Sequence, residues 1–300
     1  MPPIMKILGT EWNKGEVLLA DGAWGTELFK RGLMQGSPPD EWNLTHPDIV
    51  REIAREYCDA GADIVLTNTF GANRFRLEPH GLSARVAEIN AAGAAVARDA
   101  AAGKKLVAGD IGPTAKFIAL GEVSPEELAN AFREQAESLA RAGVNWIVVE
   151  SMTDMEEMAI AVRAAVDSTG LPVVASMTYN RTPKGYRTMM GNTPEACVQR
   201  AEEAGAALIG ANCGSGIEDY VPLAPVLRSL TKLPVWVKAN AGVPQIVNGK
   251  VAYPLTPGQY ASFVPALVAE GVDVIGGCCG TDPGFIREMG KTIGRGKGRP

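Results

Sequence analysis

The stretch GADIVLTN, residues 61–68, joins a glycine suited to a helix end to a run of apolar residues. Glycine is favoured just after a helix because it adopts the left-handed backbone conformation at little steric cost. An apolar run without polar alternation is typical of a parallel strand that is buried on both faces. The same junction occurs three more times, at residues 143–147, 205–209 and 271–275. We therefore expect a chain built from repeated helix–strand units.

Eight apolar runs of this kind are spaced evenly along the chain, and they begin near residues 17, 63, 105, 145, 172, 207, 234 and 273. The segments between them carry helix signals, such as the capping-box pair Ser124 and Glu127. Right-handed crossovers between eight parallel strands favour a (β/α)8 barrel, or TIM barrel. No Gly-x-Gly-x-x-Gly motif follows the first run, which disfavours a dinucleotide-binding sheet. We expect one α/β domain over residues 1–290 and a basic, flexible tail at residues 291–300.

The composition fits a folded protein without a nucleic-acid or membrane partner. Of the 300 residues, 34 are acidic and 29 are basic, whereas phosphate binding needs a basic face. No run of about 18 apolar residues could span a membrane, and the first residues lack the charged start and apolar core of a signal peptide. We therefore expect a cytoplasmic protein with reduced cysteines. Its five cysteines, two of them adjacent, indicate metal or thiol chemistry.

Three of the cysteines lie where barrel enzymes place catalytic groups. Cys213 ends the sixth apolar run, and Cys278 and Cys279 end the eighth. The C-terminal ends of the strands form the catalytic face of a TIM barrel. Cys58 and Cys197 instead fall on apolar helix faces, where a buried cysteine packs as a small hydrophobic residue. We therefore expect a three-sulfur site at the barrel mouth.

A three-sulfur site suits a catalytic zinc ion. Zinc takes four ligands, and a catalytic site leaves one position to water or substrate. Three thiolates on Zn²⁺ give a formal charge of 2 − 3 = −1, so a thiol that binds as the fourth ligand would lose its proton yet stay electron-rich. Hydrolytic zinc sites use histidine more, and this chain has only two histidines. The residues alone leave open a redox site formed by the adjacent cysteines.

Six motifs, in order along nearly the whole chain, resemble the homocysteine-binding barrel of cobalamin-dependent methionine synthase. The broader homocysteine S-methyltransferase family shares the cysteine pattern. The resemblance implies a TIM barrel in which three cysteines, here Cys213, Cys278 and Cys279, hold Zn²⁺ and the homocysteine thiolate takes the fourth position. The motifs are DGAWGTELFKRG (21–32), GADIVLTNTFGANRFRLEPHGL (61–82), GDIGPT (109–114), GANCGSG (210–216), NAGVPQIVNGKVAYPLTP (240–257) and GGCCGTDP (276–283).

The resemblance also implies how the amino-acid end of homocysteine is held. The family's acidic residue in the first motif and its glutamate after the fourth strand correspond to Asp21 and Glu150, and two carboxylates suit an ammonium group. Without the resemblance, these carboxylates could form a helix cap or a loop salt bridge. The substrate carboxylate would meet the backbone amides of Gly22, Ala23 and Trp24. Three side-chain amides would position loops or donate hydrogen bonds to the cysteine sulfurs, and they belong to Asn68, Asn212 and Asn240.

Two departures from the methionine synthase pattern bear on the substrate. Lys238 and Ala239 stand where Glu-Pro is expected, and Ser151 replaces a threonine. A lysine at this position could favour a more anionic thiol than homocysteine. Neither His46 nor His80 lies in the corrinoid-binding pattern Asp-x-His-x-x-Gly, so methylcobalamin would have to be carried by a partner protein.

These features predict a standalone zinc-dependent thiol S-methyltransferase that activates homocysteine as a zinc-bound thiolate and methylates it to methionine. The methyl donor would be external, either a methyl-corrinoid protein or a small donor, and the reaction would belong to methionine biosynthesis. Two other functions stay open. One is a methyltransferase component of a corrinoid-dependent demethylation system with another acceptor, and the other is a non-catalytic zinc-containing subunit that docks a corrinoid protein.

Overall fold

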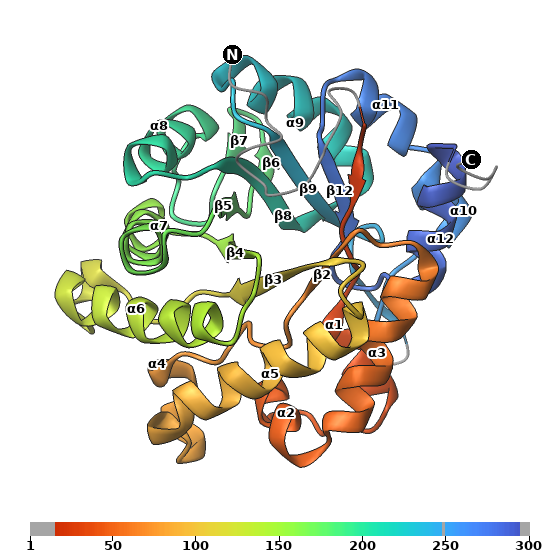
Figure 1. Ribbon diagram of the computed structural model, residues 1–300. Coiled ribbons are helices and arrows are strands. Elements are labelled where there is room, and N and C mark those ends of the chain that lie inside the picture. The colour runs from red at the N-terminus through yellow and green to blue at the C-terminus, as the bar shows by residue number, and fades with distance from the viewer. Residues whose placement is uncertain (1–15, 248–249, 295–300) are drawn as a thin grey trace.

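The computed structural model describes residues 16–247 and 250–294. Within them, eight parallel strands form a nearly closed barrel with helices around its outside, which confirms the predicted fold (Figure 1). The strands follow the order β1-β12-β9-β8-β5-β4-β3-β2, and a parallel bridge between Ala20 and Ile64 brings the two ends of the sheet together. The strands are β1 (Leu18–Leu19), β2 (Ile64–Leu66), β3 (Leu106–Ile111), β4 (Trp146–Met152), β5 (Val173–Met177), β8 (Leu208–Gly216), β9 (Val235–Asn240) and β12 (Val274–Gly277).

The helices between the strands begin and end at the signals in the sequence. Ser124 and Glu127 form both contacts of the capping box, and Gly61 ends its helix with a left-handed φ of 106°. The helices are α1 (Trp24–Lys30), α2 (Trp42–Thr45), α3 (Pro47–Ala60), α4 (Arg74–Leu77), α5 (Val86–Ala101), α6 (Pro125–Arg141), α7 (Met155–Thr169), α8 (Pro194–Ala204), α9 (Ile217–Leu230), α10 (Pro257–Ala261), α11 (Val264–Ala269) and α12 (Pro283–Thr292). Short 3-10 turns are η2 (Pro39–Glu41), η3 (Glu78–His80), η4 (Ser83–Arg85) and η5 (Ile118–Leu120).

Two antiparallel hairpins lie outside the barrel sheet. The first follows β5 and pairs β6 (Asn180–Thr182) with β7 (Gly185–Arg187). The second follows β9 and pairs β10 (Gln245–Val247) with β11 (Lys250–Ala252). Both hairpins therefore start from the C-terminal ends of barrel strands.

Alternate residues of the strands face two separate cores. Along β4, Trp146 and Val148 belong to a core inside the barrel, whereas Ile147 and Val149 belong to a larger core between the strands and the helices. The inner core also contains the fully buried Trp236 of β9. Because side chains fill the barrel, its interior is a packed core and not a pore. A binding or catalytic site would therefore lie at the ends of the strands.

The C-terminal end of the chain differs in part from the expectation. Helix α12 runs to Thr292, so the predicted boundary at residue 290 falls inside this helix and residues 291 and 292 continue it. Residues 1–15 of the predicted domain and residues 295–300 of the predicted tail lie outside the described residues. None of the helices that the structure describes combines the length and apolar character needed to cross a bilayer.

Candidate metal centre and substrate pocket

Cys213, Cys278 and Cys279 come together at the C-terminal end of the barrel. Cys213 lies on β8, and the other two directly follow β12. These two strands flank β9 and both pair with it, which brings distant parts of the sequence side by side. The three sulfur atoms lie within 4.8 Å of one another. In the part of the chain that the structure describes, no other group of three His, Cys, Asp or Glu side chains is arranged to hold a metal ion.

Hydrogen bonds fix the backbone around the cysteines. The amide of Cys278 donates to the carbonyl of Ala239 at 2.7 Å, and the carbonyl of Cys278 accepts from the Thr281 hydroxyl at 2.7 Å. The carbonyl of Cys213 accepts from the buried Tyr220 hydroxyl of α9 at 2.8 Å. Each cysteine segment is thus tied to a neighbouring element, so the barrel itself determines the sulfur positions.

The three thiols shift one another's pKa values. Hydrogen bonds from Cys278 and Cys279 lower the pKa of Cys213 to about 3. The hydrogen bonds to Cys213, together with burial, raise the pKa of Cys278 well above its usual value and that of Cys279 to about 11. The cluster therefore favours one thiolate that accepts from two thiols. Three sulfur donors with a negative charge among them suit a soft divalent cation, which would replace the two remaining protons.

The other two cysteines do not belong to this cluster. Cys197 is buried on α8, and Cys58 of α3 packs against the larger core between the strands and the helices. Burial raises the pKa of both thiols to about 11. Both are therefore packing residues, as their positions on apolar helix faces predict.

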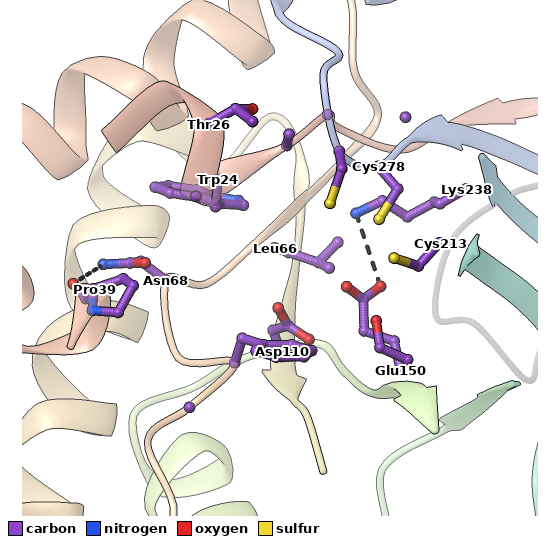
Figure 2. A pocket seen from close by; sticks show the side chains of 18 of the residues that line it. Trp24, Thr26, Pro39, Leu66, Asn68, Asp110, Glu150, Cys213, Lys238 and Cys278 are labelled. Atoms are coloured by element: carbon purple, nitrogen blue, oxygen red, sulfur yellow. Dashed lines mark hydrogen bonds and ion pairs between the residues drawn. The ribbon is translucent and has the colours of Figure 1, made fainter. Parts of the chain in front are cut away.

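A cavity of about 390 Å³ opens beside the three cysteines, with Trp24, Asn68, Asp110 and Glu150 around it (Figure 2). The predicted substrate contacts that line it are Gly22, Ala23, Trp24, Asn68 and Glu150. The predicted contacts that do not line it are Asp21, Asn212 and Asn240, which are buried in its surroundings.

Asp21 is fully buried, and protein donors already bind both of its carboxylate oxygens. Its Oδ1 accepts from the Lys238 ammonium at 2.8 Å. Its Oδ2 accepts from the amide of Leu66 at 2.7 Å and from the Trp24 indole at 3.0 Å. Asp21 thus links the end of β1 to β2 and β9, and both of its oxygens accept hydrogen bonds from protein donors.

Two other carboxylates line the cavity, and each has one oxygen that accepts no hydrogen bond. Asp110 is 4% exposed and Glu150 is 7% exposed, and neither Oδ1 of Asp110 nor Oε2 of Glu150 has a hydrogen-bond partner among the described residues. Oε2 of Glu150 lies 4.0 Å from the Lys238 ammonium. Burial is the main cause that raises the pKa of each carboxyl. Both groups can therefore accept hydrogen bonds from a ligand.

The three asparagines hold neighbouring segments in place. Asn212 accepts from the amide of Ser151 at 2.8 Å and lies 4.0 Å from the sulfur of Cys278. Asn240 donates to the carbonyl of Gly214 at 3.2 Å, next to Cys213. Asn68 donates to the carbonyl of Pro39 at 2.9 Å. Asn68 thereby ties the end of β2 to η2, while the other two support the backbone beside the cysteines.

Of the backbone amides predicted to bind the substrate carboxylate, that of Ala23 already donates to a protein group. The amide of Ala23 donates to the Thr281 hydroxyl at 3.2 Å, and a Cβ added at Gly22 would lie 2.8 Å from the same hydroxyl and from the Tyr57 ring. This tight packing requires glycine at position 22 and places the start of α1 directly against the cysteine segment.

Asp110 and Lys238 also line the cavity. Sequence reasoning did not single out Asp110, and it treated Lys238 only as a departure from a pattern. One signal for Asp110 was present, because it lies in the motif GDIGPT at the end of the third apolar run. A carboxylate at the C-terminal end of a barrel strand faces the catalytic side.

Comparison with known proteins agrees with this geometry. The family profile described as homocysteine S-methyltransferase matches residues 18–293. The chain belongs to this family. The metallated form of the homocysteine methyltransferase MmuM from Escherichia coli has the same fold, with a TM-score of 0.79 at 24% identity over 95% of this chain and 98% of that chain.

Longer relatives include the methionine synthases of Mycobacterium tuberculosis and Mycobacterium leprae. Each is 32% identical to this chain, over 296 and 298 residues that cover 92% and 93% of it. The chain spans 24% of the length of either relative. The similarity therefore concerns one barrel within a much longer protein.

Proposed function

We propose that this protein is a zinc-dependent thiol S-methyltransferase that methylates homocysteine to methionine. The observation that carries the proposal is the three-sulfur cluster beside a cavity that Asp110 and Glu150 line. Three protein sulfurs leave the fourth position of a tetrahedral zinc site to a substrate sulfur. The cavity of about 390 Å³ falls in the size range of small-molecule sites.

Cys213, Cys278 and Cys279 would hold the zinc ion. Zinc bound there would lower the pKa of the substrate thiol, and the three cysteine sulfurs would keep the substrate sulfur electron-rich. The remaining residues of the cavity would bind and orient the substrate. Glu150 would accept from its ammonium group, and the Trp24 ring would form the facing wall.

The methyl transfer would be a single displacement at carbon. The substrate sulfur forms a bond to the methyl carbon while the bond from that carbon to the donor breaks, and the electron pair of the broken bond leaves with the donor. The thiol proton passes to solvent beforehand. The cavity residues thus contribute by holding the sulfur in line with the methyl group. The donor comes from outside the chain, as a small molecule or on a methyl-corrinoid partner protein.

A donor screen tests this function. Zinc-loaded protein is incubated with homocysteine and one of four donors: methylcobalamin, S-methylmethionine, betaine, or methyltetrahydrofolate with a corrinoid protein. Methionine formed with any donor supports the proposal and identifies the donor class. The Cys279→Ser variant should form none, whereas the Cys197→Ser variant should keep the activity. Zinc-replete protein that forms no methionine with all four donors contradicts the proposal.

The number of protein ligands distinguishes an enzyme from a non-catalytic docking subunit. Structural zinc sites are usually closed by four protein ligands, whereas the cluster in the described residues offers three sulfurs. The geometry therefore favours the enzyme.

A further inference from the structure

A second cavity, of about 400 Å³, adjoins the substrate cavity. The two cavities share Pro39, Asp40, Gly71 and Arg76 in their walls. Figure 2 shows Pro39 on the side of the substrate cavity that lies away from the cysteine sulfurs. The second cavity is lined by segments that follow β1, β2 and β3, and its volume falls in the range of small-molecule sites. In the proposed function this cavity holds no ligand.

Three basic side chains line the second cavity without forming an ion pair. They are Arg76 of α4, His80 of η3 and Lys116, which follows β3. Among the described residues, none of the three forms an ion pair or a side-chain hydrogen bond. The neighbouring Arg74, by contrast, pairs with Glu134 at 2.9 Å. An anion in the cavity would therefore meet basic groups whose hydrogen-bond donors are free.

Asp40 is the acidic residue among those that line this cavity, and its carboxyl lies against the Gly71 backbone. It is 3% exposed, its Oδ1 accepts from the Gly71 amide at 2.9 Å, and a Cβ added at Gly71 would lie 2.8 Å from its Oδ2. Arg76 is close enough to lower the pKa of Asp40, but burial outweighs this effect and raises it to about 6. The side chains that the cavity offers to a ligand are therefore mainly basic.

The segment that carries Lys116 is held in a strained conformation. Ala115 has a φ of 61°, in the left-handed region that residues other than glycine rarely adopt. On either side of it, the Lys116 amide donates to the Thr114 hydroxyl at 3.3 Å and the Thr114 amide donates to Glu157 at 2.7 Å. Strained residues persist where their surroundings hold them, and they gather at functional sites. Lys116 is thus positioned by the fold beside the cavity.

Apolar groups complete the wall of the second cavity. They are the Phe75 ring and the prolines Pro38, Pro39 and Pro79. Proline fixes the backbone φ, so this part of the wall is rigid, and an aromatic ring offers a large apolar surface to a ligand. A wall of this kind suits an anion with an apolar body better than a bare inorganic ion.

We propose that the second cavity binds a small organic anion, whose carboxylate or phosphate group is held by Arg76, His80 and Lys116 and whose apolar body packs against Phe75. Hydrogen bonds between ionised donors and acceptors are stronger than neutral ones, and arginine matches both carboxylate and phosphate geometry. The shared wall places such a ligand directly beside the substrate cavity. The inference goes beyond the proposed function and depends on neither zinc nor homocysteine, so either can fail without the other.

NMR spectroscopy of the imidazole signals tests the inference, because the chain has only two histidines. His80 lines the cavity, whereas His46 stacks on Trp42 away from it and is the internal control. The probes are benzoate, phenyl phosphate, inorganic phosphate and benzamide, which is a neutral molecule with the shape of benzoate. Each is titrated into the full chain at constant pH and ionic strength, and the displacement of the signals gives a Kd.

We expect benzoate or phenyl phosphate to displace the His80 signals saturably and to leave those of His46 in place. The tighter of the two identifies the anionic group that the cavity prefers. Benzamide lacks the charge and inorganic phosphate lacks the apolar body, so each should bind about tenfold more weakly or less than that. The inference is overturned if neither aromatic anion binds saturably, or if benzamide binds as tightly as the better of them.

Variants of the basic residues locate the site. Arg76→Gln and Lys116→Gln should each weaken binding of the tighter probe about fivefold or more, through loss of a charged hydrogen-bond donor. Arg74→Gln is the matched control, because Arg74 lies on the same helix but pairs with Glu134 and does not line the cavity. Undiminished binding in both the Arg76→Gln and Lys116→Gln proteins, or an equal loss in the Arg74→Gln protein, would show that the anion binds elsewhere.

Discussion

Cys213 and Ser151 share an unusual backbone conformation. Both have a φ of 60°, in the left-handed region that residues other than glycine rarely adopt. Asn212 connects to both, because it precedes Cys213 in the chain and its side chain accepts from the Ser151 amide and donates to the Ser151 hydroxyl at 2.7 Å. Strained residues persist where their surroundings hold them, and they gather at functional sites. Asn212 thus helps to hold the backbone of this part of the cysteine cluster in shape.

Replacing Cys213 or Cys279 by serine should abolish stoichiometric zinc binding, because a serine hydroxyl does not ionise near neutral pH. Metal content per chain after dialysis measures the effect. Cys58→Ser and Cys197→Ser are the matched controls and should retain about one zinc per chain. Full zinc retention in the Cys213→Ser protein would show that the metal is bound elsewhere.

Asp40 should make stability depend on pH. Burial raises its pKa from 3.8 to about 6, even though its Oδ1 accepts from the Gly71 amide at 2.9 Å. The folded protein thus holds this proton more tightly than the unfolded chain. The stability that the neutral carboxyl contributes is complete below pH 4 and is lost as the pH rises through 6.

Raising the pKa from 3.8 to about 6 corresponds to about 3 kcal/mol. The Asp40→Asn protein lacks this titration, so its free energy of unfolding relative to the native chain should rise by up to that amount between pH 4 and pH 7. Urea unfolding of both proteins across this range measures the difference. A difference that is constant with pH would mean that Asp40 titrates normally.

The turn between β12 and α12 places the cysteine pair, and Gly280 is its critical position. Gly280 has a φ of 81°, and an added Cβ would overlap the Tyr253 ring. Gly294, after α12, has the same φ of 81° but open space around it. Substitutions at the two glycines therefore distinguish the cost of backbone strain from the cost of steric overlap.

We predict that Gly294→Ala costs only the strain of a left-handed residue, about 1 kcal/mol. Gly280→Ala should cost more and should also weaken zinc binding, because the Tyr253 ring or the cysteine segment has to move. Urea unfolding and metal titration of both variants check this. Equal costs with unchanged zinc affinity would show that the ring moves aside freely.

Most helices and strands were predictable because their signals are local. A capping box acts within one helical turn and a glycine stop at one residue, so Ser124 and Gly61 have the predicted roles in the structure. The hairpins β6–β7 and β10–β11 carry no comparable signal in the sequence. Their strands have three residues each and pair outside the barrel sheet, so they lack the long apolar runs that identify the barrel strands.

The pairing of buried charges depends on closure of the barrel. Lys238 contacts Asp21 although they are 217 positions apart, and they meet because β1 and β9 both pair with β12. From the sequence, each residue could be placed at a strand end, but their mutual contact could not be predicted. That contact removes Asp21 from the cavity surface and leaves Asp110 and Glu150 there. The meeting of Cys213, Cys278 and Cys279 could be predicted from their positions at strand ends, whereas the pairing of the charged side chains around the cavity could not.

Thiol activation at the three-cysteine site is tested most directly by X-ray absorption at the zinc edge, which counts the sulfur atoms around the metal. For the zinc-loaded protein we predict three sulfur ligands and one lighter atom, and on addition of homocysteine four sulfurs at about 2.3 Å. Homoserine, which carries a hydroxyl in place of the thiol, should leave the three sulfurs unchanged. A zinc shell that already holds four protein ligands and does not respond to homocysteine would contradict the proposed mechanism.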